Sequence, residues 1–145
     1  MEMKNGSALS NLKVLDLGRV IAGPLASSIL ADMGADVIKI EDPGTGDLAR
    51  NMMPKKDGIS TYFVMFNRGQ RGVTLNLKST QGKAILTKMI ESADVLIENF
   101  RPGVMQRLGF SYEEVEKINP RIIYASVSGY GQEGVYSGRA LLDPV

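Results

Sequence analysis

Positively charged residues stand in or beside the glycine-containing segments that follow the predicted strands: Arg19, Arg50, Lys55, Lys56, Lys78, Arg101 and Arg107. Arginine can hold a phosphate through two parallel hydrogen bonds, and lysine supplies a compact positive charge. In an open sheet of parallel strands, ligands bind outside the carboxyl ends of the strands. These residues therefore predict a rim that suits a polyanion such as a nucleotide diphosphate, with ordinary solvated surface charge as the alternative.

The sequence contains no His and no Cys, so any chemistry within this chain must use Asp, Glu, Lys, Arg, Tyr, Ser or the backbone. Within these 145 residues, that absence excludes a Ser-His-Asp relay, a thiol nucleophile and the common zinc sites. Asp16 and Glu98 stand on or at the end of predicted strands, where burial would shift their pKa values and make either one a candidate base. The alternative for both is a structural partner, either an Arg side chain or backbone N–H groups.

The segment after the first predicted strand, G-R-V-I-A-G (18–23), matches phosphate-binding motifs only in part. It lacks the middle glycine of G-x-G-x-x-G, and Pro24-Leu25 stand where a P-loop needs Lys followed by Ser or Thr. Nicotinamide-dependent and nucleotide-hydrolysing functions therefore lack their phosphate-binding element. The segment Pro-Gly-Thr-Gly-Asp (43–47) is interpreted as a turn, with an anion-binding nest as the alternative.

Strands that alternate with helices position these residues. Short apolar runs predict strands over residues 13–17, 36–41, 73–77, 94–99 and 121–127. Residues 42–60 have no sustained period and are predicted to form a long loop. Alternation of this kind predicts an α/β fold built on an open parallel sheet.

Helical periodicity predicts the flanking helices. The first begins at Pro24 and ends before Gly34, and its apolar face is Leu25, Ile29, Leu30 and Met33. The second follows Ser79 as its N-cap, and its inward stripe is Ala84, Ile85, Met89, Ile90 and Ala93. A short helix is predicted over residues 104–108, and an S-x-x-E capping box at Ser111 opens another.

Composition and charge fit one soluble domain. The 145 residues are 43% apolar with a net charge of +1, which fills one core and gives too little charge for a dedicated nucleic-acid or anionic-membrane binder. The sequence has neither a secretory signal nor a run of about 18 apolar residues, so we expect a soluble, cytoplasmic protein. We expect residues 1–11 to be a flexible tail and residues 12–145 to form the domain. The apolar residues 140–145 stand where another element should begin, so we interpret the chain as part of a longer protein.

Several stretches resemble one family when they are taken together, and they occur in a consistent order from about residue 12 to the last residue. They are V-L-D-L-G-R-V-I-A-G-P (14–24), L-A-D-M-G-A-D-V-I-K-I-E-D-P-G-T-G-D (30–47), Y-F-V-M-F-N-R-G-Q-R-G-V-T-L-N-L-K-S (62–79), A-D-V-L-I-E-N-F-R-P-G-V-M-Q-R-L-G (93–109) and N-P-R-I-I-Y-A-S-V-S-G-Y-G-Q-E-G (119–134). The chain resembles the amino-terminal part of a family III CoA-transferase, the group that includes formyl-CoA:oxalate and carnitine CoA-transferases and 2-methylacyl-CoA racemase.

This resemblance implies a Rossmann-like large domain, which a smaller domain completes in full-length members, and a homodimer of interlocked subunits. The implied substrates are acyl-CoA and a carboxylic acid, with coenzyme A held at the strand edge and no metal. Transferase members use an Asp nucleophile that forms acyl anhydrides and then a CoA thioester with the enzyme, which divides one acyl exchange into easier steps. That Asp is expected beyond Val145, so no catalytic residue is assigned within the chain, and the 145 residues alone are expected to be inactive.

Position by position, the CoA contacts of the family correspond to Arg19, Val20, Ala22, Leu75, Lys78, Asn99, Phe100 and Arg107. The resemblance implies that Lys78 and Arg107 hold phosphates, and that Leu75 and Phe100 shape the path of the adenine and the pantetheine. Arg19 stands where some members have His and would also face a phosphate.

The sequence departs from the family patterns at several positions. Ile21 replaces a Gln of the formyl-CoA transferases, Glu41-Asp42 supply acids where that pattern has an Arg, and Val135 replaces a Pro. Leu142 stands where racemases carry a proton-transferring His, which favours the transferase branch over the racemase branch. The alternatives are a racemase-like fragment, a non-catalytic CoA- or nucleotide-binding module, and a purely structural or interaction fragment.

Overall fold

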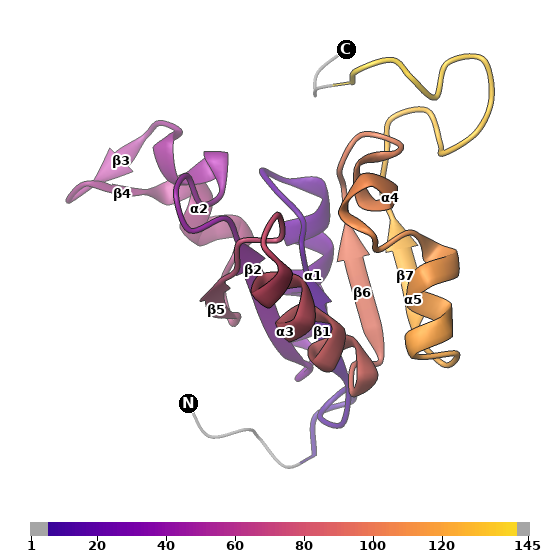
Figure 1. The fold of residues 1–145 in the computed structure, drawn as a ribbon. Coiled ribbons are helices and arrows are strands. Elements are labelled where there is room, and N and C mark those ends of the chain that lie inside the picture. The colour runs from indigo at the N-terminus through magenta and orange to yellow at the C-terminus, as the bar shows by residue number, and fades with distance from the viewer. Residues whose placement is uncertain (1–5, 142–145) are drawn as a thin grey trace.

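The computed structural model describes residues 6–141, and its centre is a parallel sheet of five strands in the order β5-β2-β1-β6-β7 (Figure 1). The strands are β1 (Lys13–Asp16), β2 (Asp36–Glu41), β5 (Arg71–Thr74), β6 (Val95–Glu98) and β7 (Ile123–Ser126). The chain runs from β1 outward to β2 and β5, and then crosses back to β6 and β7. The predicted α/β fold with an open parallel sheet and flanking helices is therefore confirmed.

Helices and one small hairpin complete the fold. The helices are α1 (Ala22–Asp32), α2 (Thr61–Phe66), α3 (Thr80–Glu91), α4 (Val104–Leu108) and α5 (Tyr112–Ile118), with a short 3-10 helix η1 (Leu48–Asn51). The two-residue strands β3 (Lys55–Lys56) and β4 (Ile59–Ser60) pair antiparallel beside α2. The predicted loop over residues 42–60 thus contains η1 and this hairpin, which Figure 1 shows projecting from the main sheet.

Alternating side chains of the strands divide the core between the two faces of the sheet. On one face, Leu15 and Leu96 pack with Leu86 and Ile90 of α3 and Val115 of α5. On the opposite face, the smaller cluster of Val14, Val37, Val95 and Ile97 packs against α1. Because successive residues of a strand point to opposite faces, a continuous apolar run such as β6 fills both cores at once.

The first helix differs from its prediction. It begins at Ala22 rather than at Pro24, and it buries its small residues, namely Gly23, Pro24, Ser27 and Ser28. Two members of the predicted apolar face, Ile29 and Met33, are 48% and 45% exposed. Small side chains let the helix approach the β1 loop closely, so close packing rather than hydrophobicity selects the buried face of α1. The prediction from the apolar pattern is therefore wrong for this face.

Three further predictions need correction. The third strand covers Arg71–Thr74 rather than residues 73–77. In α3 the buried residues are Gly82, Leu86 and Ile90, whereas Ile85 of the predicted stripe is exposed. Ser111 precedes α5, but its hydroxyl donates to Glu113 and makes no capping bond to the helix backbone. By contrast, Ser79 caps α3 as predicted, accepting from the N–H of Gly82.

The segment before β1 contacts the domain within the residues described. The N–H of Leu9 donates to the carbonyl of Met33 (3.1 Å), and Leu9 and Leu12 pack on the α1 side of the sheet. Flexibility of residues 1–11 stays a prediction, and Leu142 and the D-P-V segment (143–145) lie outside the described residues. No helix in the described range is long and apolar enough to span a membrane.

Candidate functional site

The strand order places a topological switch point at the carboxyl ends of β1 and β6. The connection after β1 leads to one side of the sheet and the connection after β6 to the other, so the loops that follow these two neighbouring strands diverge. Open α/β sheets bind ligands at such a topological switch point. The loop after β1 (residues 17–21) and the segment after β6 (99–103) therefore form the candidate site (Figure 1).

Two glycines let the β1 loop fold back on the start of α1. A Cβ atom on Gly18 would lie 2.7 Å from the Cα of Gly23, and a Cβ on Gly23 would lie 2.7 Å from the Cα of Gly18. Contacts this short require that neither residue has a side chain. The spacing G-x-x-x-x-G (18–23) thus serves close backbone packing at the switch point.

Val20 occupies the left-handed region of backbone conformation, with φ 66°. This region is uncommon for residues other than glycine and is an outlier for a β-branched residue. The surrounding structure must hold such a residue in place, and strained residues of this kind cluster at functional sites. The N–H of Val20 donates to Oδ1 of Asp47 (3.0 Å), a side chain 27 residues further along the chain.

Asn99 joins the two loops across the switch point. Its Oδ1 accepts from the N–H of Arg19 (2.7 Å), and its Nδ2 donates to the carbonyl of Arg19 (2.9 Å). The guanidinium of Arg19 lies over the ring of Phe100, 5.0 Å from the ring centre, a cation–π contact. The structure therefore brings together three of the predicted CoA-binding residues, Arg19, Asn99 and Phe100.

A buried ionic cluster lies directly beneath this loop. Lys39 is 2% exposed, and its Nζ donates to the carbonyl of Gly18 (2.9 Å) and lies 3.0 Å from Oδ2 of Asp47 and 3.7 Å from Oδ2 of Asp16. Asp16 also accepts from the N–H of Gly18 (2.7 Å). Burial raises the pKa of Asp16 to about 6, against the opposing effect of the positive charge of Lys39.

Arg50 is committed to a partner inside the protein. It donates to both carboxylate oxygens of Glu41 (2.7 and 2.6 Å), and its guanidinium stacks 3.8 Å from the centre of the Phe63 ring. Burial opposes the ionisation of Glu41, but its hydrogen bonds with Arg50 and with the N–H of Asp47, together with nearby positive charge, lower its pKa. Arg50 therefore anchors η1 and α2 rather than contributing an unpaired charge to the predicted anion-binding rim.

Lys78 stands at the same edge as Arg19. It is exposed, two residues before the start of α3, and both side chains lie near Asp42, whose pKa they help to lower. Hydrogen bonds from the N–H groups of Gly44 and Thr45 are the larger cause of that shift. Among residues 6–141, Lys78, Arg19 and Arg107 form no ion pair within 4.0 Å, in contrast to Arg50, Arg68 and Arg71. These cations are therefore available for an anionic ligand.

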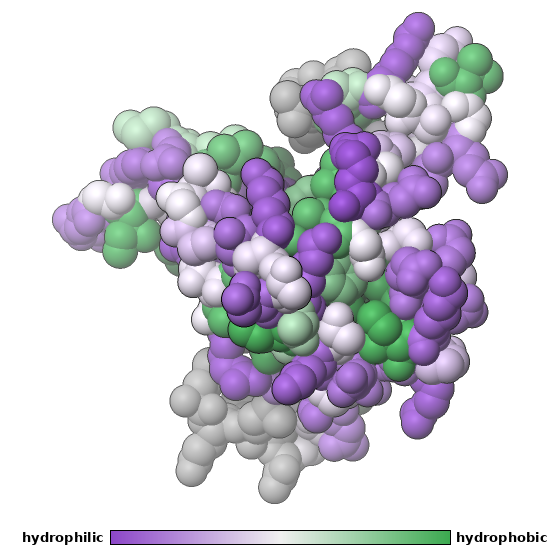
Figure 2. Space-filling view, viewed as in Figure 1, coloured by the Kyte–Doolittle hydropathy of each residue, from purple (hydrophilic) through white to green (hydrophobic). Residues whose placement is uncertain are grey.

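The remaining predicted contacts lie in different environments. Arg107 is exposed on α4, close to Gly103 at the helix start, and Ala22 is the first residue of α1. Leu75 follows β5 and packs in the main core, where it is 8% exposed. Figure 2 shows this face hollowed between the lobe of α2, β3 and β4 and the lobe of α4, with apolar surface between hydrophilic residues.

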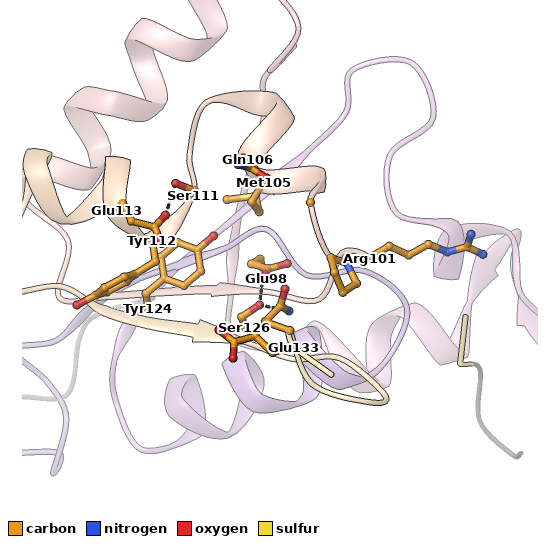
Figure 3. A pocket seen from close by; sticks show the side chains of 13 residues that line it. Glu98, Arg101, Met105, Gln106, Ser111, Tyr112, Glu113, Tyr124, Ser126 and Glu133 are labelled. Carbon is orange, nitrogen blue, oxygen red and sulfur yellow. Dashed lines mark hydrogen bonds between the residues drawn. The ribbon is translucent and has the colours of Figure 1, made fainter. Parts of the chain in front are cut away.

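A cavity of about 540 Å³ lies beyond the switch point, between the ends of β6 and β7 and the helices α4 and α5 (Figure 3). Its lining includes three carboxylates, from Glu98, Glu113 and Glu133, and the side chain of Arg101 extends away from Glu98. Burial raises the pKa of Glu98, while its hydrogen bonds with Ser126 and the N–H of Phe100 oppose the shift. This acidic lining does not suit a polyanion.

Sequence reasoning missed Lys39 and Asp47. Lys39 interrupts the apolar strand D-V-I-K-I-E (36–41), and Asp47 ends the glycine-rich turn, which was interpreted only as a turn or an anion nest. A lysine within a strand that is buried on both faces must find a carboxylate, because an unpaired buried charge is costly. The sequence therefore indicates that Lys39 is paired, but it does not identify Asp47 as the partner.

The fold defines an α/β protein with an open parallel sheet whose strand order places a topological switch point at its carboxyl edge. Residues 9–145 match the sequence profile of CoA-transferase family III, and the chain belongs to that family. The resemblance inferred from the sequence motifs is therefore confirmed.

Named relatives agree with this membership. The chain is 55% identical over 123 residues to the acetyl-CoA:oxalate CoA-transferase of Acetobacter aceti (85% of this chain, 32% of the relative). It is 43% identical over 145 residues to the succinyl-CoA:glutarate CoA-transferase of Homo sapiens (99% and 33%). A crystal structure of a CAIB/BAIF family protein from Brucella suis superposes with a TM-score of 0.88 at 39% identity (94% and 37%). The chain thus spans about a third of the length of the curated relatives it matches.

Proposed function

We propose that this chain is the CoA-binding amino-terminal segment of an acyl-CoA transferase, which moves CoA between an acyl-CoA and a carboxylic acid. The observation that carries the proposal is the arrangement at the switch point. Asn99 holds the backbone of Arg19, whose guanidinium lies over Phe100, and Lys78, which has no ion-pair partner among the described residues, stands at the same edge. Family membership supplies the chemistry of the ligand, and the two named relatives are both CoA-transferases.

The proposed division of labour follows the chemistry of coenzyme A. Lys78 and Arg107 would hold phosphate groups, because both are exposed cations without an ion-pair partner among the described residues. Phe100 offers an aromatic face to the adenine or the pantetheine, and Arg19 lies between the ring and the phosphates. Val20 and Ala22 contribute the backbone of the β1 loop, and Leu75 supports the rim from within the core.

The acyl-transfer step itself would use a carboxylate nucleophile located beyond the 145 residues. Attack by such a carboxylate on the thioester forms an acyl anhydride with the enzyme and releases CoA thiolate. The CoA-binding edge must retain this thiolate until it attacks the anhydride, which releases the donor acid and forms the enzyme–CoA thioester that the acceptor acid then attacks. In the complete protein we propose a homodimer that acts on small-molecule substrates in the cytoplasm, without nucleic acid, membrane or metal.

Isothermal titration calorimetry of the chain with CoA tests the proposal. Lys78→Ala and Arg107→Ala should each weaken binding about ten-fold or more, because a hydrogen bond between charged groups contributes about 1.5–3 kcal/mol. Pantetheine, which lacks the nucleotide, should bind more weakly than CoA and respond little to either substitution. The matched control is Lys88→Ala, an exposed cation in the last turn of α3, which should leave the affinity unchanged.

Two results would contradict the proposal. One is the absence of CoA binding by the folded chain. The other is CoA binding that Lys78→Ala and Arg107→Ala leave as tight as Lys88→Ala does, because the phosphates would then lie elsewhere.

A further inference from the structure

The β1 loop is held by side chains from three other elements, although it carries the strained residue Val20. Asp47, at the N-cap of η1, accepts from the N–H of Val20 (3.0 Å) and of Ala49 (2.9 Å). Lys39 of β2 donates to the carbonyl of Gly18 (2.9 Å), and Asn99 pairs with both backbone polar groups of Arg19. The backbone from Gly18 to Val20 is thus hydrogen-bonded at successive residues.

We infer that Asp47 and Lys39, together with Asn99, are positioning residues that hold the strained turn at Val20 and so aim Arg19 at the ligand. The inference deepens the proposed function and rests on it, since the ligand is taken to be coenzyme A. Asp47 is 1% exposed and Lys39 is 2% exposed. Neither side chain can reach a ligand at the rim, so both act through the loop.

The direction of Arg19 follows from the constraints on its backbone. Its N–H and its carbonyl are both bound by Asn99, which fixes the peptide groups on either side, and Asp47 binds the N–H of Val20 in the second of these peptide groups. The left-handed conformation at Val20 turns the chain sharply at this point. On this backbone, the guanidinium of Arg19 lies over the ring of Phe100.

The charge of Lys39 explains why a buried aspartate can perform this role. Asp47 accepts two backbone N–H bonds at Oδ1 inside the protein, and a buried carboxylate requires a compensating charge. Lys39 supplies that charge at 3.0 Å from Oδ2 of Asp47. Because Lys39 also binds the Gly18 carbonyl, one cation stabilises the carboxylate and the first residue of the loop together.

Three variants of Asp47 separate positioning from general stability. Asp47→Ala removes the acceptor for the Val20 N–H, whereas Asp47→Asn retains an amide oxygen there. Val20→Gly combined with Asp47→Ala replaces the strained residue by one that adopts positive φ without cost. The control is Leu86→Ala on α3, which removes a fully buried core side chain away from the loop.

Two readouts are measured at a temperature at which each variant is folded. The first is amide hydrogen exchange at Arg19 and Val20, which reports whether the turn is held. The second is the dissociation constant for CoA by calorimetry. We expect Asp47→Ala to lose amide protection and to weaken CoA binding about ten-fold, Asp47→Asn to stay within about three-fold of the wild type, and the double variant to recover most of the lost affinity. Leu86→Ala should lower the melting temperature without changing either readout.

Each result decides the question. Wild-type protection and affinity in Asp47→Ala would overturn the inference, as would an equal loss in Leu86→Ala. If Asp47→Ala does not fold, failure of the Val20→Gly combination to restore folding and binding, together with weak binding in Asp47→Asn, would overturn it. If the wild type does not bind CoA while Asp47→Ala still loses protection at Val20, the proposed function fails and the holding of the turn is supported.

Discussion

Two regions of the carboxyl edge carry buried carboxylates, and they use them differently. At the ends of β1 and β2, Asp16 and Asp47 surround the ammonium of Lys39 and bind loop backbone. At the ends of β6 and β7, Glu98 binds Ser126 and the N–H of Phe100 and faces a cavity of about 540 Å³. Burial raises the pKa of both Asp16 and Glu98.

The difference shows that a carboxylate at a strand end is not by itself a sign of acid–base chemistry. Asp16 pairs with Lys39 and accepts from the N–H of Gly18. These contacts agree with the structural role given in the sequence analysis as the alternative to a candidate base. Glu98 also binds backbone, yet it lines open space where a ligand or another segment could lie. Lys39 forms ion pairs with both carboxylates of the first cluster. Glu98 has no ion-pair partner among the described residues, so we expect substitutions in the second region to cost less stability.

Removal of the central cation should have the largest effect on the first region. Lys39→Met leaves two buried carboxylates without a compensating charge, and breaking such a pair costs about 3–5 kcal/mol of unfolding free energy. Urea denaturation at pH 7, followed by circular dichroism, measures this loss. Arg71→Ala, which breaks an exposed pair with Asp36 (2.7 Å), is the control and should cost less than about 1 kcal/mol. Similar losses in the two variants would show that the buried cluster has no special role.

The pH dependence of the unfolding free energy tests the role of Asp16. Its pKa in the folded protein, about 6, lies above the ordinary 3.8, so the folded state binds the proton more tightly than the unfolded state. This carboxyl therefore contributes stability that is fully present below about pH 4 and is lost as the pH rises through 6. At about 1.4 kcal/mol per pH unit, the loss amounts to about 3 kcal/mol.

Asp16→Asn should remove this pH dependence, because the amide keeps an oxygen for the Gly18 N–H and does not titrate. Urea denaturation of both proteins from pH 4 to pH 7 gives the difference, in which effects of other groups such as Glu41 cancel. Parallel stability curves for the two proteins would mean that Asp16 is already ionised below pH 4 when folded.

The smallest effect is expected in the second region. Glu98→Gln keeps acceptor and donor groups for Phe100 and Ser126 and avoids the cost of burying a charge, so the unfolding free energy at pH 7 should change by less than about 1 kcal/mol. The same denaturation experiment measures it. A loss comparable to that of Lys39→Met would mean that the negative charge of Glu98 holds this edge, and the contrast between the two regions would fail.

Much of the architecture could be predicted from local pattern. Four of the five strands, namely β1, β2, β6 and β7, and most helices follow from local sequence patterns. Ser79 caps α3 as predicted, because a capping hydroxyl acts on backbone only three residues away. The face of α1 could not be predicted in the same way. There the close approach of Gly18 and Gly23 selected small residues, and Ile29 and Met33 remain exposed.

For the candidate site too, some features follow from the sequence and others only from the tertiary structure. Residue types and motif order alone determined that this is an α/β protein of CoA-transferase family III, with cations near the strand ends, because strand periodicity and motifs are properties of the linear chain. Tertiary structure alone decided which cations are unpaired and which are committed. Arg50 is taken by Glu41 and Lys39 by Asp47, whereas Lys78 and Arg107 form no ion pair among the described residues. Such pairings join residues on different elements, and their energies depend on burial and on distances of a few ångströms that no sequence spacing specifies.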